Sequence, residues 1–174
     1  MRIESWVCVT AVLLLMLGGA IAAEPQQCRR SPIPSNVELA HDLERVLGRI
    51  YDRSPAFRAQ CERIASATNL RVRVRIDTSI PGYCRAFTII QRRGGDIRAD
   101  VHLPPTSDLI ELVGHEFEHL LEQIEGLDLR RLVRVKGSGV HEVDGRVFET
   151  ERAQAAGRVV AAEAGRQHKA PAAD

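Results

Sequence analysis

The residues best suited to chemistry are His115, Glu116 and His119, which form an HExxH motif. On a helix, positions i and i+4 lie about one turn apart on the same face, so both imidazoles can bind one metal ion. The glutamate between them can then reach a water molecule beside the ion. Zinc suits this pattern because it takes imidazole ligands and lowers the pKa of a bound water to about 7. The motif therefore predicts a Zn²⁺ site in which Glu116 is the general base.

A catalytic zinc site needs a third protein ligand, for which the sequence offers two candidates. His119 is not followed by the HxxGxxH extension of metzincins. A final helix is expected from about Val143 to Glu163, and on it Glu149 shares a face with small and apolar residues. These neighbours are Gly145, Ala153, Ala156 and Val160. Glu149 is therefore favoured as the third ligand, and Glu142, seven residues earlier, is the alternative.

An HExxH motif completed by a glutamate further along the chain resembles that of the gluzincins, the thermolysin-like zinc metallopeptidases. The resemblance covers His115 to His119 together with Glu149. It implies Zn²⁺ as the cofactor, hydrolysis of peptide bonds, and a peptide or protein as the substrate. It also implies that the strand expected at residues 96–103 lies at the edge of a sheet above the metal and holds the substrate backbone.

Two features depart from the pattern of this family. Ala153 stands four residues after Glu149, where many gluzincins have an aspartate that orients a histidine ligand. Both tyrosines lie upstream of the motif, so the donor that stabilises the oxyanion must be another residue. The downstream candidates are His141 and Arg146, and each is equally well explained as a surface residue near a loop. His41, His102 and His168 are interpreted as structural or exposed.

The spacing of apolar residues predicts the elements that position the motif. Two helices are expected first, one at residues 37–52 with Asn36 as its N-cap and one from Pro55 to about Asn69; strands follow at 70–77, 83–91 and 96–103. The HExxH helix begins after Ser107 or Asp108, ends near Gly126 and is apolar enough to be central. The expected fold is a minimal zincin-like α+β domain. Its small antiparallel or mixed sheet of about three strands packs on the HExxH helix and a C-terminal helix.

The N-terminal residues have the pattern of a secretory signal. Val7 to Ala20 is almost uninterrupted apolar sequence, too short to cross a bilayer comfortably, and Ala20-Ile21-Ala22 suits signal peptidase. We expect a signal peptide at 1–23, an extended leader at 24–35, the peptidase domain at 36–165 and a disordered tail at 166–174. The protein would then be periplasmic or secreted, without stable membrane insertion. An uncleaved N-terminal anchor is the alternative.

The balance of charged residues limits the kinds of partner that the sequence predicts. Lys and Arg total 24 against 23 Asp and Glu, so the formal net charge of +1 gives no strong attraction to nucleic acid.

Cleavage of the signal leaves Cys28, Cys61 and Cys84, an odd number. Of the three pairings, Cys61 with Cys84 is favoured. No CxxC spacing occurs, so a cysteine zinc site is not expected.

Three classes of function fit these residues. The first is zinc-dependent peptide-bond hydrolysis outside the cytoplasm. The second is an exported zinc-binding protein without turnover, and the third is an exported interaction domain in which the histidines fill the core. The substrate, its sequence preference and the oligomeric state are not specified by the sequence.

Overall fold

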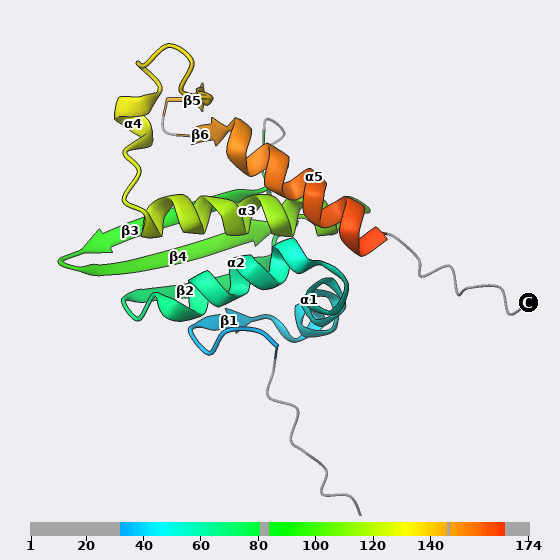
Figure 1. The fold of residues 1–174 in the computed structure, drawn as a ribbon. Helices are drawn as coiled ribbons and strands as arrows, with labels where there is room; N and C mark the ends of the chain where they lie inside the picture. Colours follow the sequence, from blue (N-terminus) through cyan, green and yellow to red (C-terminus); the bar gives the residue numbers. More distant parts are fainter. Residues whose placement is uncertain (1–31, 81–83, 146, 166–174) are drawn as a thin grey trace, which may run out of the picture.

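The computed structural model of the chain describes residues 32–80, 84–145 and 147–165 (Figure 1). Within them the elements follow in the order β1 (Val37–Leu39), α1 (His41–Arg53), α2 (Pro55–Ser66), β2 (Leu70–Ile76), β3 (Phe87–Arg93), β4 (Asp96–Leu103), α3 (Leu109–Ile124), α4 (Leu129–Leu132), β5 (Val140–Asp144), β6 (Val147–Thr150) and α5 (Glu151–Gly165). The expected signal peptide and tail lie outside the described residues, and so does Arg146. No described helix is both long and apolar enough to cross a membrane.

The fold is α+β, as predicted, with a mixed four-stranded sheet and a separate β5–β6 hairpin. The strand order is β1-β2-β4-β3, in which β2 is parallel to β1 and β4, and β3 is antiparallel to β4. The expectation that residues 96–103 form an edge strand is therefore wrong. β3 and β4 form a hairpin, and β2 pairs with the other side of β4, from Leu70 opposite Ile97 to Ile76 opposite Leu103. The edge next to the HExxH helix is β3.

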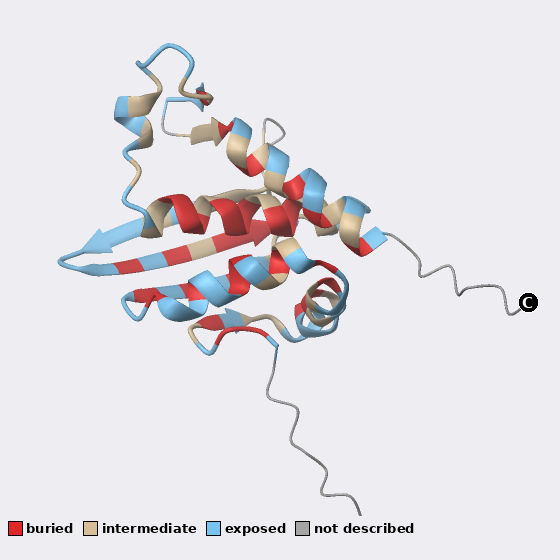
Figure 2. Ribbon diagram, viewed as in Figure 1, coloured by how far each residue is buried: buried red, intermediate tan, exposed pale blue. Residues whose placement is uncertain are grey.

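Alternation along the strands places the core on one face of the sheet. The inward residues of β2 and β4 are buried under the helices (Figure 2); they are Leu70, Val72, Val74, Ile97, Ala99, Val101 and Leu103. The residues between them on β2, which are Arg71, Arg73 and Arg75, are exposed. The alternating arginines of β2 therefore form a solvated face.

The start of the first helix differs from the prediction. Val37–Leu39 is a short strand, because Val37 and Leu39 pair with Val72 and Val74 of β2, and α1 begins only at His41. Asn36 does not cap α1. Its side-chain amide donates instead to the carbonyl of Ile64, 2.9 Å away, in the last turn of α2. Three residues are too few for their periodicity to distinguish a strand from the first turn of a helix.

The last helix also begins later than predicted. β5 and β6, at residues 140–144 and 147–150, pair as an antiparallel hairpin, and α5 starts at Glu151. This segment is rich in valine, threonine and phenylalanine, which favour strands, and Gly145 adopts a φ of +46° at the turn. The Thr150 hydroxyl accepts a hydrogen bond from the N–H of Ala153 at 2.9 Å and so caps α5.

Two further expectations concern side chains away from the motif. Cys61 and Cys84 are both free, so the predicted disulfide is wrong: Cys61 is buried in α2, whereas Cys84 is half-buried just before β3. Burial raises the pKa of the Cys61 thiol to about 12. His102 is structural, as interpreted, because it is buried against Phe87 with its Nδ1 atom 2.7 Å from Asp77. His41 is exposed, and His168 lies outside the described residues.

Candidate metal centre

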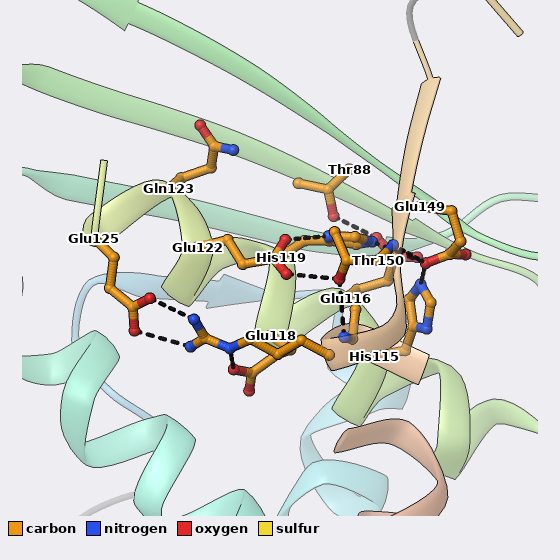
Figure 3. A network of polar contacts seen from close by, with 12 residues as sticks. Thr88, His115, Glu116, Glu118, His119, Glu122, Gln123, Glu125, Glu149 and Thr150 are labelled. Atoms are coloured by element: carbon orange, nitrogen blue, oxygen red, sulfur yellow. Dashed lines mark hydrogen bonds and ion pairs between the residues drawn. The ribbon is translucent and has the colours of Figure 1, made fainter. Parts of the chain in front are cut away.

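The HExxH motif lies in the middle of α3, where the apolar faces of the helix fix its orientation. Val113, Phe117 and Leu120 are fully buried in the core around it. The remaining face carries His115 and His119, whose rings lie 4.9 Å apart and nearly perpendicular. Their side chains are only 14% and 13% exposed. Two largely buried imidazoles, one turn apart, therefore point to the same side of the helix (Figure 3).

Glu149 approaches the two histidines from β6. Its Oε1 atom lies 3.2 Å from Nε2 of His115 and 3.6 Å from Nε2 of His119. The three residues each offer one donor atom within 4.8 Å of the others. Ligand atoms about 2.0–2.1 Å from a tetrahedral zinc ion lie about 3.4 Å apart, so both contacts of Glu149 match the spacing that such an ion requires. The donor set of two nitrogens and one oxygen also suits zinc.

The β5–β6 hairpin determines where Glu149 lies. The Thr150 N–H donates to Oε1 of Glu149 at 2.8 Å, and the N–H of Glu151 donates to the carbonyl of Gly139 at 2.8 Å, tying the end of the hairpin to its start. Glu149 is therefore on a strand and not on the expected helix. Glu142, the alternative ligand, is exposed on β5 and does not belong to the cluster.

Of the two candidate oxyanion donors, the structure describes His141 and does not bring it to the cluster. His141 stands opposite Glu149 in the hairpin register, but its side chain is 61% exposed and lies 3.8 Å from Glu151. Arg146 is outside the described residues. The structure thus brings together His115, Glu116, His119 and Glu149 from the expected site.

Glu122 is a site residue that the sequence analysis missed. One of its carboxylate oxygens lies 2.8 Å from Nδ1 of His119, and the other accepts a 2.6 Å hydrogen bond from the Thr150 hydroxyl. Its side chain is 1% exposed. The contact leaves Nε2 of His119 facing Glu149 and supplies the orienting carboxylate that Ala153 cannot provide. The signal in the sequence was an acidic residue three positions after His119 on an apolar helix.

Glu116 lies at the bottom of the site. It is 2% exposed, and the hydroxyl of Thr88 on the edge strand β3 donates to its Oε2 atom at 2.6 Å. Burial raises the pKa of Glu116, although the neighbouring His119 and His115 counteract part of this effect. Because its pKa is raised, the carboxylate of Glu116 is a stronger base than an ordinary exposed carboxylate and is suited to accept a proton.

The charges around the histidines are strongly coupled. Burial alone would lower the pKa of His119, but its hydrogen bonds to Glu122 and Glu149 outweigh burial and raise the pKa to about 10. Burial also opposes ionisation of Glu149, yet its contacts with His115 and His119 hold its pKa far below the usual range. The cluster therefore favours two negative carboxylates facing a positive charge. A proton on His119 supplies that charge when a metal cation does not.

Two glycines let α5 pack closely on α3 beside the site. A Cβ atom at Gly157 would lie 2.7 Å from the carbonyl oxygen of Glu111 and 3.1 Å from Cβ of His115. A Cβ atom at Gly114 would lie 2.7 Å from the side chain of Val160. The last helix therefore lies close against the HExxH helix.

An open groove of about 1410 Å³ runs over the cluster. Its floor is α3, with His115, Glu116 and His119, and its walls are β3 on one side and the β5–β6 hairpin with α5 on the other. Within the part of the chain that the structure describes, the outer edge of β3 has no partner strand.

Comparison with known proteins identified no relative of this chain. No protein-family model, curated protein or solved structure matches the chain. The interpretation of the site therefore depends on its own geometry and chemistry.

Proposed function

We propose that this protein is a zinc-dependent hydrolase of peptide bonds, with His115, His119 and Glu149 as the metal ligands. The observation that carries the proposal is the placement of Glu149, whose Oε1 atom lies 3.2 Å and 3.6 Å from the two imidazole nitrogens. Three donors at this spacing hold a zinc ion with one position left for a reactant. An ordinary structural ion pair would not need two histidines to share one carboxylate oxygen.

The protein groups around the donors have complementary roles in this proposal. When bound, zinc acts as a Lewis acid that polarises the scissile carbonyl and makes water easier to deprotonate. Glu116 accepts the proton of the attacking water and later passes it to the leaving amine. Thr88 orients the Glu116 carboxylate, and Glu122 fixes the ring of His119.

The shape of the groove supports a peptide or protein as the substrate. The outer edge of its β3 wall has no partner strand among the described residues, so an extended peptide can add there as a further strand. A peptide in this position lies directly over Glu116, because Thr88 of β3 contacts that residue. In this proposal β3 holds the substrate backbone, which is the role that the resemblance implied for residues 96–103.

The apolar N-terminal sequence supports the further proposal that the protein acts outside the cytoplasm. Mass spectrometry of the protein recovered from the periplasm or medium of an expressing bacterial host tests this. We expect a mature chain that begins after Ala22 or Ala23, and an intact Met1 in the membrane fraction would contradict cleavage.

Hydrolysis is tested by comparing the parent protein with its Glu116→Gln variant. Both are loaded with zinc and incubated with an unstructured protein such as casein, and new amino termini are counted. We expect cleavage by the parent, at least 100-fold slower cleavage by the variant, and equal zinc content. Glu62→Gln, on the exposed face of α2, is the matched control and should cleave like the parent. A parent that binds zinc but cleaves nothing would instead indicate a zinc-binding protein without turnover.

A further inference from the structure

The groove over the cluster carries several arginines, and most of them already have partners. Arg85 lies 3.1 Å from both Glu111 and Asp108. Arg92 donates to the backbone and side-chain oxygens of Gln123, and Arg130 stacks over the ring of Phe148. These three cations are held by the protein itself.

Arg158 differs from the other arginines of the groove. It lines the groove and is exposed, and it makes no hydrogen bond or ion pair with any other described residue. Its position is well defined, because the preceding residue, Gly157, packs directly against Glu111 and His115 of α3. Arg158 is therefore a cation of the groove, carried by α5, without a partner among the described residues.

The acidic side chains that line the groove contact residues other than this guanidinium. Glu149 contacts both histidines, and Glu116 accepts a hydrogen bond from Thr88. Glu111 and Asp108 are already paired with Arg85. The guanidinium of Arg158 is then left without a partner among the described residues in a concave site, where a ligand carboxylate can accept two parallel hydrogen bonds from it.

We propose that Arg158 determines specificity by binding a carboxylate of the substrate at the His115 end of the groove. The proposal deepens the proposed function and rests on it, since it names the class of peptide that the groove takes. The carboxylate has two sources, which are an aspartate or glutamate side chain within the peptide and the free carboxylate at its C-terminus. Arg158 acts by recognition and has no part in the proton transfers assigned to Glu116.

The test measures equilibrium binding to the zinc-loaded Glu116→Gln protein, so that turnover is not needed. Fluorescent hexapeptide mixtures are compared in matched pairs, with Glu or Gln at each position in turn, and with a free or amidated C-terminus. We expect one member of a pair to bind about fivefold to 20-fold more tightly through its carboxylate. A preference for Glu identifies a side-chain carboxylate, and a preference for the free acid identifies the C-terminus.

Variants then assign the preference to Arg158. In Arg158→Gln the difference between the paired peptides should fall to less than twofold, and Arg158→Lys should keep part of it. Arg158→Glu should reverse it in favour of a peptide with Lys at the same position. Arg49→Gln, an exposed change on α1 outside the groove, is the control and should behave like the parent.

The outcomes separate this inference from the proposed function. Equal binding of every peptide pair, no peptide binding, or a preference that survives in Arg158→Gln would overturn the role of Arg158 and leave hydrolysis by the parent unaffected. Conversely, a preference that depends on Arg158 in a protein that never cleaves a peptide would support the carboxylate site and contradict the hydrolase.

Discussion

The Nδ1 atom of His119 lies 2.8 Å from a carboxylate oxygen of Glu122, one helical turn further along α3. The same carboxylate accepts a hydrogen bond from Thr150, so it ties the HExxH helix to the hairpin that carries Glu149. One buried acidic side chain thus orients a candidate ligand and holds the two elements of the site together.

The first prediction concerns this contact. Glu122→Gln should weaken zinc binding by about 10- to 100-fold, because a neutral amide orients the imidazole less firmly and makes it less basic. Competition against a chromophoric chelator measures the affinity. Glu118→Gln is the matched control on the same helix, since Glu118 is bonded to Gln60 and Arg152 and not to the histidines. Equal affinity for Glu122→Gln and the parent would exclude the orienting role.

The second prediction distinguishes the two glutamates considered as third ligand. Glu149→Gln should weaken zinc binding more than Glu122→Gln does, because it removes a direct donor together with its charge. Glu142→Gln should have no effect, since Glu142 is exposed on β5 and outside the cluster. The same chelator competition compares the two variants. A larger loss in Glu142→Gln than in Glu149→Gln would reverse the assignment.

The third prediction is that zinc binding releases a proton. Hydrogen bonds to Glu122 and Glu149 raise the pKa of His119 to about 10, so at pH 7.5 the metal-free protein carries a proton there. The metal needs neutral imidazole, so the proton must leave and zinc affinity must rise with pH up to that value. Titration calorimetry in buffers of different ionisation enthalpy should give about one proton released at pH 7.5. A binding enthalpy that does not depend on the buffer would contradict this charge arrangement.

The fourth prediction concerns the packing of α5 on α3. Gly157→Ala should lower the free energy of unfolding by about 1–3 kcal/mol, because its Cβ would meet the backbone carbonyl of Glu111 at 2.7 Å. Gly48→Ala is the control, since nothing lies within 4 Å of its Cβ in the middle of α1, and it should stabilise by about 0.5–1 kcal/mol. Urea denaturation measures both. Two stabilising substitutions would show that the helices are not in close contact at Gly157.

Much of the site could be predicted because its signals are local. His115, Glu116 and His119 lie within five residues of one another, and the apolar residues around them indicated a central helix. Glu149 was chosen by assuming a helix over residues 143–163, and the structure has a helix there only from Glu151 onward. Glu149 reaches the histidines from a strand, so the helical argument selected the residue on an incorrect geometric basis.

The features that were missed depend on contacts between distant segments. The parallel pairing of β2 with β4 makes β3 the edge strand, and no local pattern specifies it. The bond between Glu122 and Thr150 joins residues 28 positions apart. Glu122 itself could have been noticed, because an acidic residue in an apolar helix is costly to bury unless it has a partner.

The central claim is that His115, His119 and Glu149 bind one zinc ion, and X-ray absorption at the zinc edge of the loaded protein tests it most directly. The account predicts one zinc per chain with two imidazole nitrogens near 2.0–2.1 Å and carboxylate oxygen near 2.0–2.2 Å. The oxygen signal of the carboxylate should be lost in Glu149→Ala. Zinc that fails to bind in stoichiometric amounts, or a spectrum unchanged by replacing either histidine, would contradict the account.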